Sequence, residues 1–177
     1  VFLLFASMQA LIEGALSKTL ANQSYEVAWK GAKPPPGATP RSSSGSTMVV
    51  GGGPAATSLS GDLAAAGSIC IHISTDSKTF ERKDSLSFAV DGSDPGHFDQ
   101  LLQTAPECQT VVYVVPESSE RNSESPAQAL FHLAQALDRT KWQCRVYVVT
   151  CQAQKVGGPI LKDVDGAAVW GLGRVLA

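Results

Sequence analysis

The stretch Thr47–Asp76, TMVVGGGPAATSLSGDLAAAGSICIHISTD, decides the fold of this chain. An apolar β-type run, Thr47–Val50, leads into the glycine-rich turn Gly51–Pro54. Glycines have no Cβ, so they allow positive φ angles and a close approach of other backbone. A segment of helical composition, Ser58–Ala66, and a second β-rich run, Ser68–Ser74, follow. Strand, glycine turn, helix and strand form a βαβ unit, which predicts a parallel sheet with a right-handed crossover.

The glycine turn also carries the sharpest chemical suggestion in the sequence. Gly51-x-Gly53-x-x-Ala56 fits a dinucleotide-binding fingerprint, and Asp76 follows the next strand, about where a ribose-binding carboxylate is expected. In such sites the amides of a helix N-terminus face a pyrophosphate. Pro54 removes one amide from this turn, and glycine runs are also ordinary turn material. Two interpretations stay open: a cofactor site built on these residues, or a βα turn without a ligand.

Composition and charge narrow the class of protein. The 177 residues are 44% hydrophobic and 17% charged, with a net charge of −2, which predicts one globular domain of ordinary size. A nucleic-acid or anionic-membrane partner would call for clustered basic residues. The cysteines Cys70, Cys108, Cys144 and Cys151 show no CxxC spacing, so we expect reduced thiols in a cytoplasmic protein. No apolar run reaches transmembrane length.

The segments before Thr47 predict a helix, a strand and a linker. Val1–Leu20 has apolar residues at helical spacing, and such a helix needs a partner surface. Ser24–Lys30 alternates as a half-buried edge strand does. Gly31–Ser46, rich in proline and serine, is a flexible linker. The chain starts without Met and stops within a helical pattern, so we expect a piece of a longer polypeptide.

Beyond Asp76 the patterns predict alternating strands and helices, so that the whole order is that of an open, doubly wound α/β sheet. Leu86, Phe88 and Val90 alternate as in a short strand. The remaining elements are a helix at His97–Gln103, a buried central strand at Thr110–Val115, a helix from Ser125-Pro126 to about Arg139, a buried strand at Arg145–Thr150 and a final helix at Asp165–Ala177, capped by Asp163 or Asp165.

The sequence contains no catalytic constellation. It has no Ser-His-Asp set, no Tyr-x-x-x-Lys pair, no paired carboxylates in a motif and no metal-ligand spacing. We interpret His97, near the start of its helix, as a surface or capping residue. His132 has no nearby Ser, Cys or carboxylate motif, so we interpret it as structural.

The end of the chain resembles a known family. Ala167–Ala177, AAVWGLGRVLA, is similar to the segment that closes the structural subdomain of polyketide synthase ketoreductases, and Tyr25–Trp29 resembles the YxVxW strand that opens it. Further segments that match in the expected order are Phe98–Leu102, Val111–Val115, Ala129–Leu137 and Val146–Thr150. The resemblance covers about Ser24–Ala177.

This resemblance implies a truncated Rossmann-like open parallel sheet flanked by helices. In the family, this half is non-catalytic and stabilises a downstream half, which binds NADPH and reduces β-ketoacyl thioesters on an acyl carrier protein. The TGGxGxLG loop and the Lys, Ser, Tyr and Asn of that active site do not occur here. The resemblance therefore implies no activity and no cofactor for this segment, with Gly51, Gly53 and Asp76 as relics or simple turn residues. The parent would be a multifunctional, cytoplasmic polyketide synthase.

The resemblance also implies a domain organisation and partners. Residues 1–23 are expected to form an interdomain linker helix, and residues 24–177 the subdomain, with 31–46 as its flexible linker. The expected partner is the catalytic half of the same polypeptide, with Trp29 and Trp170 at the interface; an adjacent enoyl reductase or dehydratase domain is a further candidate. The alternatives are a dinucleotide-binding domain that uses the glycine turn, and an interaction module that acts through helix 1–20.

Overall fold

The computed structural model describes residues 45–117, 125–151, 153 and 163–176. All of them belong to the second of the chain's two compact units, Gly37–Ala177. The predicted helix Val1–Leu20, the predicted strand Ser24–Lys30 with Trp29, and most of the linker lie outside the described residues.

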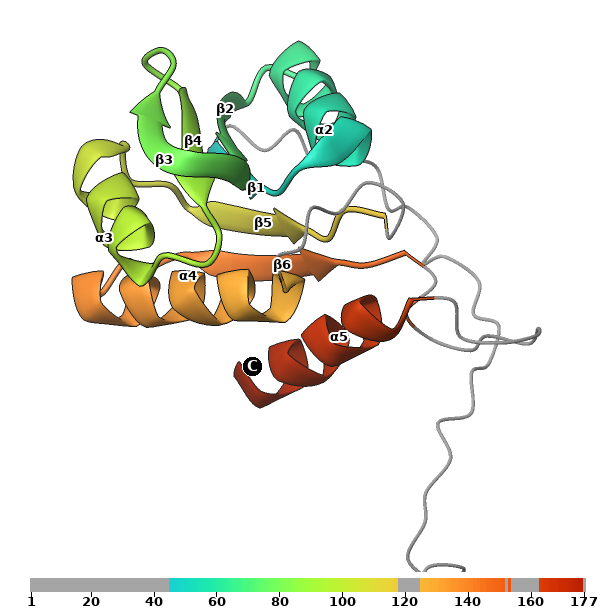
Figure 1. Ribbon diagram of the computed structural model, residues 1–177. Coiled ribbons are helices and arrows are strands. Elements are labelled where there is room, and N and C mark those ends of the chain that lie inside the picture. Colours follow the sequence, from blue (N-terminus) through green and yellow to red (C-terminus); the bar gives the residue numbers. More distant parts are fainter. Residues whose placement is uncertain (1–44, 118–124, 152, 154–162, 177) are drawn as a thin grey trace, which may run out of the picture. The chain divides into compact units, whose positions relative to one another are not determined.

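The described strands form one sheet. They are β1 (Ser46–Val50), β2 (Ile69–Ser74), β3 (Asp76–Arg82), β4 (Ser87–Asp91), β5 (Thr110–Val114) and β6 (Arg145–Val149). Their order is β3-β4-β2-β1-β5-β6 (Figure 1). All neighbouring strands are parallel except β3, which runs antiparallel to β4. The Rossmann-like α/β fold predicted from the sequence is confirmed, with one antiparallel strand that the prediction did not include.

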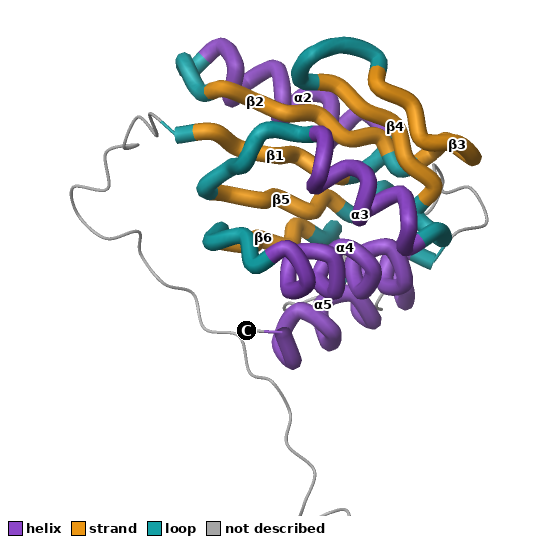
Figure 2. Tube along the Cα trace, turned by 90° about the vertical axis from the view of Figure 1, so that its left-hand side faces the viewer, coloured by secondary structure: helices purple, strands orange, loops and turns teal. Residues whose placement is uncertain are grey.

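Helices cover both faces of this sheet. They are α2 (Gly53–Ala65), α3 (Pro95–Thr104), α4 (Pro126–Thr140) and α5 (Val164–Leu176). Met48 and Val50 of β1 face a large core with α3 and α4, whereas Val49 between them packs toward α2. α5 packs on α4 (Figure 2). The chain is therefore doubly wound about β1.

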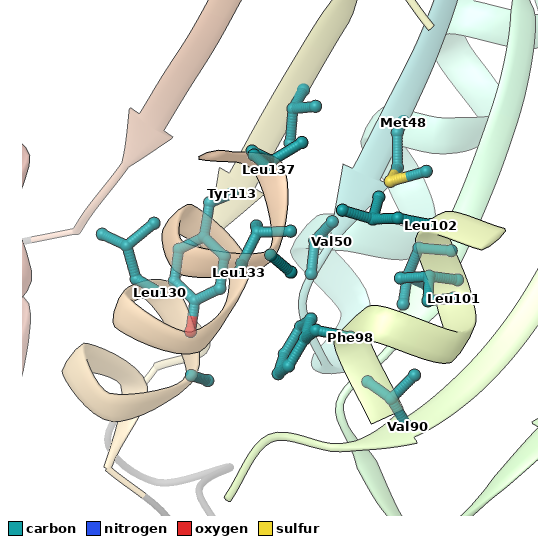
Figure 3. Close-up of a cluster of buried hydrophobic side chains, with 14 of the residues drawn as sticks. Met48, Val50, Val90, Phe98, Leu101, Leu102, Tyr113, Leu130, Leu133 and Leu137 are labelled. Atoms are coloured by element: carbon teal, nitrogen blue, oxygen red, sulfur yellow. The ribbon is translucent and has the colours of Figure 1, made fainter. Parts of the chain in front are cut away.

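The large core lies between the sheet and the pair α3 and α4. Figure 3 shows the side chains of both helices pointing toward β1, β4 and β5. The fully buried Phe98 and Leu133 come from the two helices. Tyr113 brings a hydroxyl into this core, and its Oη donates to the carbonyl of Pro126 at 2.8 Å. That bond satisfies a polar group that burial would otherwise leave costly.

β3 replaces the helix that would connect two parallel strands. Its sequence, DSKTFER, alternates charged and polar residues around Phe80, which packs against the large core. This pattern has period two and no helical apolar stripe, so a strand is the local preference. Of the described helices, α2 is therefore the one that covers its face of the sheet.

Helix limits differ from prediction mainly at their starts, while the ends of α2 and α3 differ by one residue. α2 begins at Gly53 instead of Ser58, because Pro54 is well suited to a first helical turn. α5 begins at Val164, and the Oδ1 atom of Asp163 accepts the amide of Gly166 at 3.0 Å. Asp163 is therefore the capping residue of the two that the sequence left open.

The prediction of a buried strand at Arg145–Thr150 is wrong about burial. β6 is the last strand in the sheet order, and Val146, Tyr147 and Val149 are 45%, 52% and 45% exposed. An apolar run predicts a strand, but the number of neighbours decides whether both its faces are covered.

Candidate functional site

The glycine turn lies at the carboxyl end of the central strand β1. Gly51 donates its amide to the carbonyl of Ile73 in β2 at 2.9 Å. Its φ is +151°, and a Cβ at this position would overlap the carbonyl oxygen of Val114 in β5. The turn is thus held between two neighbouring strand ends, the place where doubly wound sheets bind ligands.

Asp76 meets this turn directly. A Cβ on Gly52, the N-cap residue of α2, would fall on the Asp76 carboxylate, with its Oδ2 atom only 2.5 Å away. The carboxylate therefore lies against the backbone of Gly52. The hydroxyl of Ser74 donates to Oδ2 of Asp76 at 3.3 Å. A negative charge here is stabilised by the positive end of the α2 dipole.

The remaining fingerprint residues fit a tight βα turn. Gly53 has a φ of +80°, which a residue with a side chain rarely adopts. Ala56 is fully buried in a small cluster with Val49 and Val114, so α2 approaches the sheet closely at this small residue. Pro54, within the first turn of α2, offers no amide to a ligand.

The structure thus brings the four predicted residues, Gly51, Gly53, Ala56 and Asp76, close together around the glycine turn and the start of α2. No side chain caps α2 through a hydrogen bond, so its first amides point toward this site. The carboxylate of Asp76 already faces this helix end, and its charge repels a second anion such as a phosphate. The geometry suits a compact turn better than a pyrophosphate site.

His72 is a neighbour of the site that the sequence did not single out. It lies on β2, paired with Val49 of β1 and Ser87 of β4. Its Nε2 atom is buried without a hydrogen-bond partner. Burial lowers the pKa of His72, the positive charge of Lys83 lowers it further, and Asp76 opposes both. In the sequence, His72 was marked only as the one polar side chain in the otherwise apolar run ICIHI.

The other two histidines connect elements of the fold, which agrees with the structural interpretation of His132. Nδ1 of His97 accepts the amide of Asp91 at 3.0 Å, which joins α3 to the end of β4. Nδ1 of His132 lies 3.2 Å from the carbonyl oxygen of Gly92, and its ring packs near Phe98. Both side chains secure the turn after β4.

The cysteines are free thiols. Burial raises the pKa of Cys108 to about 11 and also raises the pKa values of Cys70 and Cys144. Thiols with raised pKa values are poor nucleophiles and poor metal ligands at neutral pH. Within the described ranges, no three His, Cys, Asp or Glu side chains are grouped to hold a metal ion.

Trp170, the second predicted interface residue, lies on α5. Its side chain is half-buried, and the guanidinium of Arg174 stands 5.0 Å from the ring centroid. The neighbouring Val169 is fully buried in the large core, whereas Val175 is 82% exposed.

None of the helices described is long and apolar enough to cross a bilayer.

No protein-family model and no curated protein matches the chain. Among solved structures, a putative NAD-dependent epimerase/dehydratase from Methylobacillus flagellatus is 18% identical with a TM-score of 0.54, over 76% of this chain and 51% of that chain. A second is the adenylation, ketoreductase and pseudo Asub multidomain structure of a keto acid-selecting NRPS module, 16% identical with a TM-score of 0.66, over 94% of this chain and 15% of that chain. The chain spans about half of the first of these structures and 15% of the second. At such identities the likeness establishes the Rossmann-like fold alone.

Proposed function

We propose that this chain is the non-catalytic structural half of a polyketide synthase ketoreductase. In this role it stabilises a downstream, NADPH-dependent half that reduces β-ketoacyl thioesters on an acyl carrier protein. The observation that carries the proposal is the segment AAVWGLGRVLA, which resembles the end of such subdomains and whose residues up to Leu176 lie in α5. In this segment Val169 is buried in the large core, while Trp170 is half-buried and Val175 is largely exposed. This arrangement leaves apolar surface for a partner.

Two further observations support the proposal. The solved structure with the higher TM-score contains a ketoreductase within a multidomain module. The glycine turn has the shape of a dinucleotide-binding turn, yet the Asp76 carboxylate lies against its helix end. Such a turn fits a Rossmann-like half that supports another half without holding the cofactor itself.

The first test is catalytic. The chain is assayed for NADPH oxidation with a β-ketoacyl thioester of N-acetylcysteamine, beside an active ketoreductase as the positive control. We expect a rate equal to the enzyme-free background, because the sequence lacks the motifs of the active site. Turnover above that background overturns the proposal.

The second test addresses stabilisation. The catalytic half of the parent polypeptide is produced separately, and its melting temperature and reductase rate are measured with and without this chain. We expect both to rise when the chain is added, because binding to a folded state stabilises it by mass action. A catalytic half that is equally stable and active alone contradicts the stabilising role.

A second candidate function is dinucleotide binding at the glycine turn. It is favoured by the convergence of Gly51, Gly53 and Asp76 at the carboxyl ends of β1 and β2. Calorimetric titration with NADPH and NADH separates the two functions. Sub-millimolar affinity that is lost in Asp76→Ala supports the binding function, since Asp76 would then hold the ribose. On the structural-half proposal, the wild-type chain has no such affinity.

A further inference from the structure

The two edges of the sheet are built differently. β3, at one edge, carries charged residues such as Glu81 and Arg82, and its register shifts between Asp76 and Glu81. Charges and irregular register are the usual means by which proteins protect an edge from further pairing. β6, at the other edge, is the regular run RVYVV, with no proline, no register shift and one charge at its start.

Among the described strands, none pairs with the backbone groups on the outer edge of β6. The amide of Arg145 donates to Gln109, and the carbonyl of Val149 accepts from Val115, both at 2.9 Å. In a parallel pair alternate residues bond to the neighbour, so Tyr147 also faces β5, while Val146 and Val148 direct their N–H and C=O groups outward.

Apolar side chains flank the same edge on both faces. Tyr147 and Val149 are about half exposed on the α2 face. On the opposite face a groove of about 300 Å³ lies between α4, β6 and α5, and its lining includes Leu130, Leu133, Leu137, Val146, Val148 and Gly173. Figure 1 shows α5 alongside β6 at this edge of the sheet.

The strand order indicates what kind of segment fits at the outer edge of β6. β4-β2-β1-β5-β6 reproduces the first five positions, 3-2-1-4-5, of a doubly wound sheet whose sixth strand lies outside the fifth and parallel to it. We propose that the outer edge of β6 binds one further β-strand, parallel to β6, from an extended segment with apolar, β-branched side chains on the face toward α5.

Each part of the surface matches such a segment. Backbone of the added strand pairs with the N–H and C=O groups of Val146 and Val148. Its side chains on the α5 side enter the groove beside these two valines. Arg145, at the amino end of β6, favours an acidic residue at the amino end of a parallel strand. This assignment does not depend on the activity of the parent protein.

Two peptides with identical composition test the proposal on the intact chain. The probe is fluorescein-labelled Glu-Val-Thr-Val-Thr-Val, and the control is the reversed sequence. We expect saturable binding of the probe by fluorescence anisotropy, weaker binding of the control, and slower hydrogen exchange at the amides of Val146 and Val148. Tighter binding of the reversed peptide overturns the parallel direction. No binding of either peptide, or self-association through this edge in sedimentation, overturns the proposal.

Two variants test the edge itself. Val148→Pro removes an amide that points away from β5, a position at which edge strands tolerate proline. It is expected to weaken probe binding by about tenfold or more, because one backbone pair is lost and the ring blocks another. Val148→Ala keeps the amide and is expected to change binding by less than about threefold. Equal effects of Val148→Pro and Val148→Ala on probe binding would contradict backbone pairing. If Val148→Pro does not fold, the test rests on hydrogen exchange at the amides of Val146 and Val148 in the wild-type chain, measured with the probe.

Discussion

At the scale of single residues, Gly51 is a position at which both the backbone conformation and the packing require glycine. Gly51→Ala is expected to lower the free energy of unfolding by about 2 kcal/mol or more, because the positive φ is strained for alanine and its Cβ overlaps the Val114 carbonyl. Gly61→Ala is the matched control, since Gly61 lies inside α2 with open space around it. That variant is expected to raise stability by about 0.5–1 kcal/mol. Urea unfolding measures both, and similar effects would contradict the special role of Gly51.

His72 predicts a pH dependence of stability. Its pKa in the folded chain is lowered, chiefly by burial, from the ordinary value of 6.5. Protonation therefore favours the unfolded chain: the contribution is complete above the unfolded pKa and is lost as the pH falls below it toward the folded pKa. We expect the free energy of unfolding to fall as the pH is lowered through and below the ordinary histidine pKa of 6.5.

His72→Gln is expected to flatten this slope in urea unfolding measured across the same range. The Asp91 carboxyl titrates in a separate window, because its pKa is lowered from 3.8, mainly by a hydrogen bond from Ser93. The contribution of the Asp91 carboxylate to stability is lost only as the pH falls below 3.8. A slope near pH 6 that survives the substitution would show that another group causes it.

At the scale of elements, α5 depends on its N-cap. Asp163 is 6% exposed, and its carboxylate accepts the amide of Gly166. Asp163→Ala is expected to destabilise the chain by about 1 kcal/mol and to speed hydrogen exchange at Gly166, whereas Asp163→Asn retains most of the cap. Unchanged exchange at Gly166 in the alanine variant would mean that packing on α4 alone fixes the start of α5.

At the scale of the whole molecule, the proposed function predicts where Trp29 and Trp170 act. In the complete two-half ketoreductase, replacing either with Ala is expected to lower the melting temperature and the reductase activity in parallel. A buried Trp→Ala change costs roughly 3–5 kcal/mol. In the isolated chain Trp170→Ala should cost less, because Trp170 is there only half-buried.

Trp142 provides the matched control for this prediction. It packs against the large core of the described residues. Trp142→Ala should therefore destabilise the isolated chain and the two-half protein alike. Effects of Trp29→Ala and Trp170→Ala within about 0.5 kcal/mol of zero in the two-half protein, the range of neutral surface changes, would contradict the interface role.

The site illustrates how far sequence reasoning reaches. The βαβ pattern predicted that Gly51, Gly53 and Asp76 would meet, because the carboxyl ends of parallel neighbours share one edge of a sheet. It did not predict that the Asp76 carboxylate would lie against Gly52, or that Nε2 of His72 would be buried without a partner. Both depend on how β3 and α2 are placed over the strands.

What the sequence determined by itself is the order and type of most elements. Apolar runs, the glycine turn and Ser125-Pro126 act through local backbone preferences, and these reach only a few residues along the chain. Only the tertiary structure decided which apolar strand is buried. TVVYV and RVYVV are nearly alike, yet among the described strands β5 has a neighbour on each side whereas β6 has one. Burial follows from neighbours that are distant in sequence, and no local pattern specifies them.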